Sequence, residues 1–297
     1  MQILGISWRP QDDGSFKSGL SVWNEKETPE FIPINPGDKL SWVFSGPRRC
    51  VGSIDSSLKS VRCPENSLIL QRGMMRCGPC SAMDFVDPCI RCDGRTCFAT
   101  PERRTQCDET NYAVYMVVFN DETLKVGVSS EKRVRTRWVE QGADFGGILH
   151  SVQGGLEARR IEDRVGKNPK AAKQVRRERK IRSLLNRLDI EAAQSIVEDF
   201  LLDVKNDDLG SSIKLEDLST YYSLIGVDTQ PNPWKRRTEK IDGRPLVGEA
   251  VGMKGSLLVT SLSSAFTIID LKQVIGYSLD YNGDITVVTQ TGLLDFC

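Results

Sequence analysis

Cysteines are concentrated in one short segment of this 297-residue chain, and no other feature of the sequence restricts its fold as strongly. Eight of the nine lie between residues 50 and 107, and they include the pairs Cys77/Cys80 and Cys89/Cys92. A Cys-x-x-Cys pair suits a tight turn that directs two thiolates at one tetrahedral metal ion. Eight thiols are enough for two four-cysteine zinc sites, so we expect this segment to fold around structural zinc.

The order of the cysteines along the chain suggests how they divide between two zinc ions. We predict that the first four hold one ion and the last four hold the other, although interleaved sets fit the spacing equally well. The ninth cysteine, Cys297, belongs to neither set. The first set is Cys50, Cys63, Cys77 and Cys80, and the second set is Cys89, Cys92, Cys97 and Cys107.

Other uses of clustered thiols stay open at this point. An iron–sulfur cluster also takes four thiolates, disulfides occur in oxidising compartments and in hyperthermophiles, and a redox pair would leave six cysteines unexplained. The chain begins without the basic and apolar pattern of a signal peptide, and no window approaches eighteen apolar residues. We therefore expect a cytoplasmic protein with no membrane partner, in which zinc is the favoured metal.

The segment after the cysteines has the pattern of a compact α/β unit. β-branched and aromatic residues form runs of strand length, and apolar residues three and four apart indicate helices. Gly142 suits the end of the first helix. The expected elements are strands over 112–119, 124–128 and 148–152 and helices over 131–140 and 156–165.

Charged side chains in this unit suit phosphodiester chemistry. The first expected helix carries Arg133, Arg135 and Arg137, and the second carries Glu162. A carboxylate can hold a divalent cation, and a guanidinium can stabilise charge that develops on a phosphate. Ordinary helix surfaces carry the same residue types, so the spacing alone favours solvation or ion pairing over a chemical role.

The unit resembles the GIY-YIG nuclease superfamily. The dipeptide Val114-Tyr115 occupies the position of the first half-motif, and Gly127 occupies the glycine of the second. The sequence Ala158-Arg-Arg-Ile-Glu162 repeats the pattern of the superfamily's metal-binding helix. The resemblance implies that Tyr115 positions or activates water and that Glu162 holds Mg²⁺ or Mn²⁺.

The resemblance also implies that an arginine of the first helix holds the phosphate. Counting from Gly127 indicates Arg135, whereas the Arg-Val dipeptide indicates Arg133, with Arg137 one turn further on. We prefer Arg133. The second half-motif has Lys125 where the superfamily has tyrosine, and a lysine serves as a base only if its pKa falls by several units.

A second resemblance covers most of the chain. The cysteine cluster, followed by Lys125-Val-Gly-Val, Arg-Trp138 and Gln141-Gly-Ala143, is similar to an uncharacterised, largely prokaryotic family. That resemblance implies a domain plan and no activity.

Nucleic-acid binding requires a local basic surface, because the formal net charge of the chain is zero. Residues 167–187 contain nine basic residues and one acidic residue and are predicted to form a basic helix. An acidic amphipathic helix over 190–203 follows and could neutralise part of it. The predicted substrate-binding residues are Lys125, Gly127, Lys173, Arg176, Arg177 and Lys180.

The fold class is predicted to be α+β with several domains. Short strands over residues 1–47, and again from Pro245 to a last strand over 285–289, predict small β-barrel-like pieces that pack together. A linker is expected over 206–210. The predicted domains are 1–47 (β), 48–110 (zinc-knuckle or ribbon-like), 111–166 (GIY-YIG-like), 167–205 (basic then acidic helices) and 206–297 (β).

Three functions fit this sequence. The first is nucleic-acid binding with metal-dependent endonuclease activity, and the second is a non-catalytic RNA- or DNA-binding module on the same scaffold. The third is a zinc-stabilised protein-interaction adaptor. Retention of Tyr115, Gly127 and Glu162 favours the first function, and Lys125 in place of tyrosine favours the second. The sequence does not distinguish RNA from DNA and indicates no oligomeric state.

Overall fold

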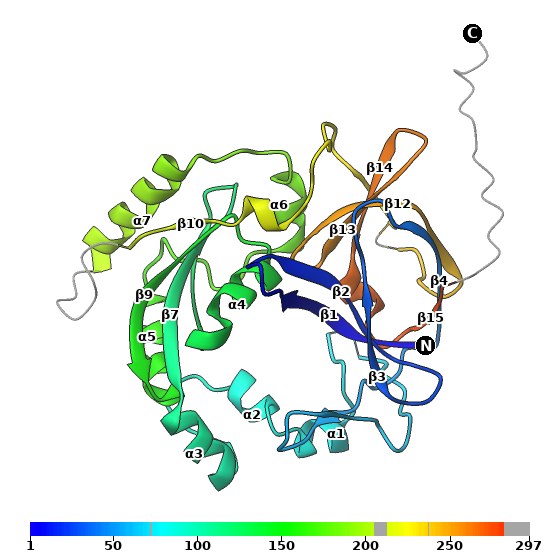
Figure 1. Ribbon diagram of the computed structural model, residues 1–297. Helices are drawn as coiled ribbons and strands as arrows, with labels where there is room; N and C mark the ends of the chain where they lie inside the picture. Colours follow the sequence, from blue (N-terminus) through cyan, green and yellow to red (C-terminus); the bar gives the residue numbers. More distant parts are fainter. Residues whose placement is uncertain (72, 205–212, 237, 282–297) are drawn as a thin grey trace.

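The computed structural model describes residues 1–71, 73–204, 213–236 and 238–281. In it a large β-sheet and an α/β unit lie side by side, and the cysteine-rich segment lies beneath both (Figure 1). The fold is therefore mixed α/β, with one large sheet and a cysteine cluster. The strand predicted over 285–289, the linker over 206–210 and Cys297 lie outside the described residues.

The large sheet is built from both ends of the described chain. Its nine strands run in the order β11-β14-β13-β12-β4-β15-β1-β2-β3, so β4 from the first part pairs with β12 and β15 from the last. The predicted closure into a barrel stays a prediction. The strands are β1 (Gln2–Pro10), β2 (Phe16–Trp23), β3 (Pro29–Pro33), β4 (Lys39–Ser45), β11 (Asn232–Pro233), β12 (Arg244–Lys254), β13 (Leu257–Leu262), β14 (Ala265–Asp270) and β15 (Ser278–Asp280). A short 3₁₀ helix, η3 (Leu271–Val274), joins β14 to β15.

The α/β unit contains the predicted order of strand, strand, helix, strand and helix. Its sheet has the order β10-β9-β7-β8, with antiparallel neighbours throughout. The elements are β7 (Asn111–Val118), β8 (Leu124–Ser130), the 3₁₀ turn η1 (Glu131–Arg133), α4 (Val134–Gln141), β9 (Phe145–Gln153), α5 (Gly155–Val165) and β10 (Glu216–Asp217). The 3₁₀ turn η2 (Ser219–Tyr221) follows β10.

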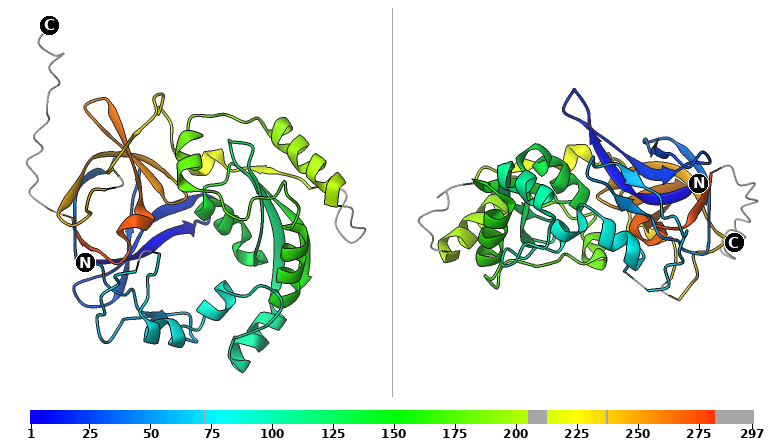
Figure 2. Two further views of the ribbon diagram at one scale, coloured as in Figure 1. Left: turned by 180° about the vertical axis from the view of Figure 1, so that it is seen from behind. Right: turned by 90° about the horizontal axis from the view of Figure 1, so that it is seen from below.

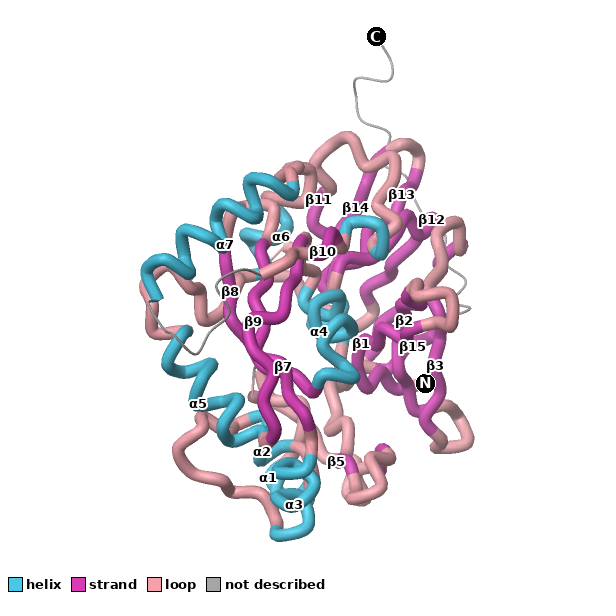
Figure 3. Tube along the Cα trace, turned by 60° about the vertical axis from the view of Figure 1, so that its left-hand side comes forward, coloured by secondary structure: helices cyan, strands magenta, loops and turns pink. Residues whose placement is uncertain are grey.

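The central strand β7 is buried on both faces. Val114, Met116 and Val118 belong to a core that includes Ala158 and Ile161 of α5. The alternate residues of β7 face α4 and join the core of the large sheet, because successive side chains of a strand point to opposite faces. Helix α4 therefore lies between the two sheets, as Figure 3 shows.

The basic segment is not the single helix predicted over 167–187. Only α6 (Arg177–Arg182) is helical there, and the acidic α7 (Ile190–Val204) follows. Ala171 instead pairs with Leu124 of β8, and the Ala172 N–H donates to the Leu124 carbonyl at 2.8 Å. Pairing with a sheet edge competes with helix formation, and Pro169 lies just before the contact.

The cysteine-rich segment has little regular structure and hardly any apolar core. Its buried cluster consists of three cysteines and Ile69, with Cys77 packed against them. So small a core does not stabilise a fold without a metal ion or cross-links. The elements are β5 (Ser53–Ile54), β6 (Ser60–Val61), α1 (Gly78–Met83), α2 (Asp87–Ile90) and α3 (Pro101–Glu109). Figure 2 shows the segment from behind and from below.

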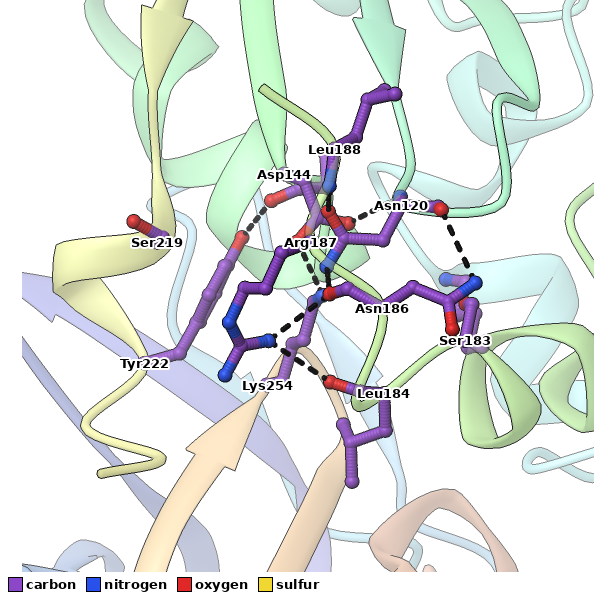
Figure 4. A network of polar contacts seen from close by, with 12 residues as sticks. Asn120, Asp144, Ser183, Leu184, Asn186, Arg187, Leu188, Ser219, Tyr222 and Lys254 are labelled. Carbon is purple, nitrogen blue, oxygen red and sulfur yellow. Dashed lines mark hydrogen bonds and ion pairs between the residues drawn. The ribbon is translucent and has the colours of Figure 1, made fainter. Parts of the chain in front are cut away.

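A buried ion pair fastens the α/β unit to the large sheet. Lys254, at the end of β12, donates to Asp144, which lies between α4 and β9, and both side chains are less than a tenth exposed. The second carboxylate oxygen of Asp144 accepts from the backbone N–H of Asn120 at 2.8 Å. Tyr222 donates its hydroxyl proton to the carbonyl of Ala143 beside this pair. Figure 4 shows this network, which continues through Asn120 to the loop after α6.

Two glycines allow the same junction to close. Gly142 ends α4 with φ +66°, and Gly255 forms the β12–β13 turn with φ +61°. A Cβ on Gly255 would lie 2.8 Å from the backbone nitrogen of Gly142. Only glycine tolerates both this backbone conformation and this contact. In the part of the chain that the structure describes, no helix has the length and apolar character needed to span a membrane.

We expect Lys254→Met to lower the free energy of unfolding by about 3–5 kcal/mol, because it leaves the carboxylate of Asp144 buried without a counter-charge. Urea unfolding followed by tryptophan fluorescence measures the change. Lys132→Met, at an exposed position of η1, is the matched control. Adding Asp144→Asn to Lys254→Met should recover part of the loss, and equal stability of the two lysine variants would contradict the prediction.

Candidate functional site

Four cysteines converge in the cysteine-rich segment. The sulfur atoms of Cys50, Cys63, Cys77 and Cys80 all lie within 4.8 Å of one another, and three of the four residues are buried. They are the set that the sequence predicts for the first zinc ion. Four thiols at this separation fit the tetrahedral four-cysteine site of structural zinc.

The backbone around these thiols is arranged to favour thiolates. The N–H groups of Cys77 and Gly52 donate to the Cys50 sulfur at 3.2 and 3.4 Å. Gly52 has φ +88°, and a Cβ there would lie 2.0 Å from the carbonyl oxygen of Val61. The turn after Cys50 therefore requires glycine, because β6 passes directly over it.

The three buried thiols of this group differ in the direction of their pKa shifts. Burial raises the pKa of Cys63, but hydrogen bonds with Ser67 and with the neighbouring thiols outweigh it and bring that pKa to about 6. Burial raises the pKa of Cys50 and, together with the neighbouring thiols, that of Cys80. Adjacent thiolates repel one another, so full ionisation of this group requires a cation among the four sulfurs.

A buried arginine–aspartate pair supports the cluster, and we made no prediction of it from the sequence. Arg76 bonds Asp84 at 2.9 Å and donates to the Gly52 carbonyl at 2.9 Å. Asp84 is 2% exposed and also accepts from the backbone of Ile54 at 2.9 Å. The pair therefore ties the segment that carries Cys77 and Cys80 to the β5 hairpin. An acidic residue four positions after a Cys-x-x-Cys pair was the available signal.

The second predicted set of cysteines is more dispersed. Among the described residues, a group of potential ligand atoms within 4.8 Å of one another is found for the first set and not for the second. Cys97 and Cys107 lie near enough to raise the pKa of Cys89, after the larger effect of burial, while Arg103 opposes them. The hydroxyl of Tyr112 bonds the sulfur of Cys107 at 3.6 Å. All eight cysteines that the structure describes are free of disulfides.

A second polar group lies on the α4 face of the α/β unit. Tyr115 of β7 is paired directly with Gly127 of β8. A Cβ on Gly127 would lie 2.4 Å from the Tyr115 hydroxyl oxygen, so the tyrosine ring covers the glycine. The two residues that carry the resemblance to the half-motifs are thus in contact, and the glycine is needed for the tyrosine's position.

Gln141, the last residue of α4, connects this group. Its side-chain N–H donates to the Tyr115 hydroxyl at 2.7 Å, and its side-chain oxygen accepts from the Lys125 ammonium at 3.0 Å. Its backbone carbonyl accepts from the Lys180 ammonium at 2.5 Å. The sequence did not predict this role, because it depends on how three separate elements meet at the end of α4.

The structure places Arg137, rather than Arg133 or Arg135, beside Tyr115. Burial raises the pKa of Tyr115, and the charge of Arg137 opposes that rise. Arg133 is 65% exposed and pairs with Glu140 at 3.0 Å, whereas Arg135 pairs with Glu216 of β10 at 2.9 Å. The preference for Arg133 is therefore not supported: Gln141 shows that the last turn of α4 faces Tyr115, and Arg137 belongs to that turn.

Glu162 completes the group from α5. Its carboxylate pairs with Arg159 at 2.6 Å, and both side chains are partly buried. The charge of Glu162 acts on Tyr115 and on Lys125. Burial lowers the pKa of Lys125, and Arg137 lowers it further. The pKa of Lys125 thus moves in the direction that general-base chemistry requires.

The predicted basic surface is divided in the structure. Lys173 and Arg176 are exposed, and Arg177 pairs with Glu178 at 2.9 Å. Lys180 turns inward to Gln141 and lies over the ring of Phe119, 5.0 Å from its centroid. The four residues therefore do not form one continuous surface.

Comparison with known proteins gives a family and no activity. A family model described as "Protein of unknown function (DUF2797)" matches residues 37–279. The match covers most of the chain, which therefore belongs to this uncharacterised family. No curated protein and no solved structure matches the chain.

We expect protein purified without added metal to contain tightly bound zinc and Cys80→Ser to lose about one ion per chain, because Cys80 is a buried member of the four-thiol group. Elemental analysis by mass spectrometry measures the metal. The unfolding temperature should fall with the metal content, since metal binding and local folding are coupled. Cys297→Ser is the control. Iron with visible absorbance, or unchanged zinc in Cys80→Ser, would contradict the assignment.

Proposed function

We propose that this member of the DUF2797 family binds nucleic acid and that its α/β unit carries a metal-dependent phosphodiesterase site of the GIY-YIG type. One observation carries the proposal: the charges of Arg137 of α4 and Glu162 of α5 both act on the hydroxyl of Tyr115 of β7. The cysteine-rich segment is the structural, zinc-binding part of the molecule. The substrate is a phosphodiester of DNA or RNA.

Tyr115 serves as a hydrogen-bond donor in this site. Because burial raises its pKa, the hydroxyl keeps its proton at neutral pH. Its oxygen accepts from Gln141, and so its own proton can point towards an attacking water molecule or a phosphate oxygen. Tyr115 therefore orients the nucleophile, and Gln141 orients Tyr115.

Arg137 and Glu162 supply the charges. The Arg137 guanidinium is half exposed and held by Glu140 at 3.3 Å, so it can reach a phosphate while keeping its direction. Glu162 is the carboxylate for Mg²⁺ or Mn²⁺, and Arg159 now occupies that carboxylate. A divalent ion held there would neutralise charge on the reacting phosphate.

A non-catalytic binding module is the second candidate, and Lys125 favours it. The lysine stands where the superfamily has its second tyrosine. Its amino group donates a hydrogen bond to the side-chain oxygen of Gln141, which favours the charged ammonium form. A charged lysine binds phosphate but does not accept a proton from water. In this alternative the same surface binds a strand without cutting it.

A second zinc ion, held by Cys89, Cys92, Cys97 and Cys107, belongs to the proposal. The contributions of Cys107 and Cys97 to the raised pKa of Cys89 support it, because they place both thiols near Cys89. Two zinc ions per chain, one of them lost in Cys97→Ser, is the expected stoichiometry. One ion per chain in both the wild type and Cys97→Ser would reject the second site.

We expect Glu162→Gln to abolish cleavage of labelled single- or double-stranded DNA or RNA in Mg²⁺ or Mn²⁺ while nearly preserving binding, because it removes a metal ligand and little phosphate contact. Arg137→Ala should lower the rate by about 10²–10³, the usual cost of losing one preorganised charge. Gel analysis of the products measures both effects.

Arg133→Ala is the matched control, because Arg133 shares Glu140 with Arg137 but is not among the groups that act on Tyr115. Its rate should stay within a few-fold of the wild type. Equal cleavage by wild type and Glu162→Gln rejects the phosphodiesterase. Absence of cleavage together with binding of the same strands supports the binding module.

A further inference from the structure

Three lysines from distant parts of the chain meet at the C-terminal end of α4. Lys125 comes from β8, Lys180 from α6 and Lys272 from η3. The ammonium groups of Lys125 and Lys180 both bind Gln141, at 3.0 Å and 2.5 Å. Lys272 is exposed, and its charge acts on both of the others. The α/β unit and the large sheet together therefore bring three positive charges to one place.

No carboxylate compensates these charges directly. Among the ion pairs of the described residues, none involves Lys125, Lys180 or Lys272. The nearby Glu162 is paired with Arg159, and the carboxylate of Asp270 accepts from the backbone N–H of Lys272 at 3.1 Å. The ammonium groups of Lys125 and Lys180 are held by neutral oxygens of Gln141, its side-chain amide oxygen and its backbone carbonyl.

The fold maintains this repulsion rather than relieving it. Burial lowers the pKa of Lys180 to about 8, and Lys272 and Lys125 contribute to the decrease. The ring of Phe119 and the last carbonyl groups of α4 favour a cation at Lys180. The charges of Glu162 and Asp270 act on Lys125 and Lys180 respectively, but neither carboxylate forms an ion pair with these lysines. Like charges held together without a directly paired carboxylate are typical of sites that bind anions.

We propose that Lys125, Lys180 and Lys272 bind one phosphate group of a nucleic-acid strand. This inference rests on the proposed function for the strand's identity, and it assigns a second contact beside Arg137, whose charge acts on Lys125. The scissile phosphate lies at Arg137 and a neighbouring backbone phosphate lies at the lysines. The lysine at the second half-motif thus holds the strand.

The test measures binding without added Mg²⁺ or Mn²⁺, using a labelled twelve-nucleotide oligothymidylate and, separately, inorganic pyrophosphate. Lys180→Met and Lys272→Met should each reduce the salt dependence of oligonucleotide binding, with the slope of log K against log salt falling by about 0.7 per lysine. Lys132→Met, at an exposed lysine outside the cluster, should retain the wild-type slope.

Thermal unfolding separates a ligand role from a structural one. Ligand-free Lys180→Met should unfold at the wild-type temperature or above it, because the substitution removes repulsion. Pyrophosphate should raise the unfolding temperature of the wild type and of Lys132→Met but not that of Lys180→Met. A lower unfolding temperature of Lys180→Met with unchanged binding of both probes means that the lysine is structural and overturns the proposal.

The remaining outcomes identify the source of the phosphate. Loss of oligonucleotide binding in the cluster variants supports a strand. A pyrophosphate effect without any oligonucleotide binding supports the phosphate site and overturns its strand assignment. Binding through the lysines without any cleavage rejects the phosphodiesterase activity of the proposed function and leaves the phosphate-binding site in place.

Discussion

The ion pair between Lys254 and Asp144 determines how the two sheets meet. Asp144 sits between α4 and β9, and Lys254 ends β12, so one contact fixes the end of α4 against the β12–β13 turn. Gln141 lies only three residues before Asp144 and holds Tyr115, Lys125 and Lys180. A buried ion pair is weak evidence for stability, but removing one partner is costly, which suits a contact that specifies one docking arrangement. Of the side chains that Gln141 binds, Lys180 comes from α6, outside the α/β unit, and joins the others at the end of α4 in that arrangement.

The two sheets and the cysteine-rich segment differ in what can stabilise them. The two sheets enclose continuous apolar cores, whereas the cysteine-rich segment encloses little more than Cys50, Cys63, Cys80 and Ile69. The four-cysteine cluster of this segment fits a structural zinc site, and the binding energy of such an ion can take the place of a hydrophobic core. The Arg76–Asp84 pair connects the two ends of α1 to the β5 hairpin, through the bond from the Ile54 backbone to Asp84.

Local patterns predicted the elements, and tertiary contacts decided the rest. The β-branched and aromatic run of β7 and the Cys-x-x-Cys pairs were readable from sequence, because strand propensity and the turn of a Cys-x-x-Cys pair act over a few residues. The choice of Arg137 was not readable, since it depends on which turn of α4 faces Tyr115. The prediction of a single basic helix over 167–187 was wrong because Ala171 pairs with the edge of β8 instead. Gln141 was missed because its partners lie on three separate elements.

The protonation state of Lys125 distinguishes the two proposed functions, catalysis and binding without cleavage. A base must lose its proton, and burial together with Arg137 lowers the pKa of Lys125 in that direction. A phosphate contact must keep the proton, and the bond to the Gln141 side-chain oxygen favours the ammonium form. An incoming phosphate adds negative charge beside three lysines and so raises the pKa of each of them. Substrate binding therefore opposes general-base chemistry at Lys125, so in the proposed site Tyr115 orients the attacking water and a divalent ion held by Glu162 would activate it.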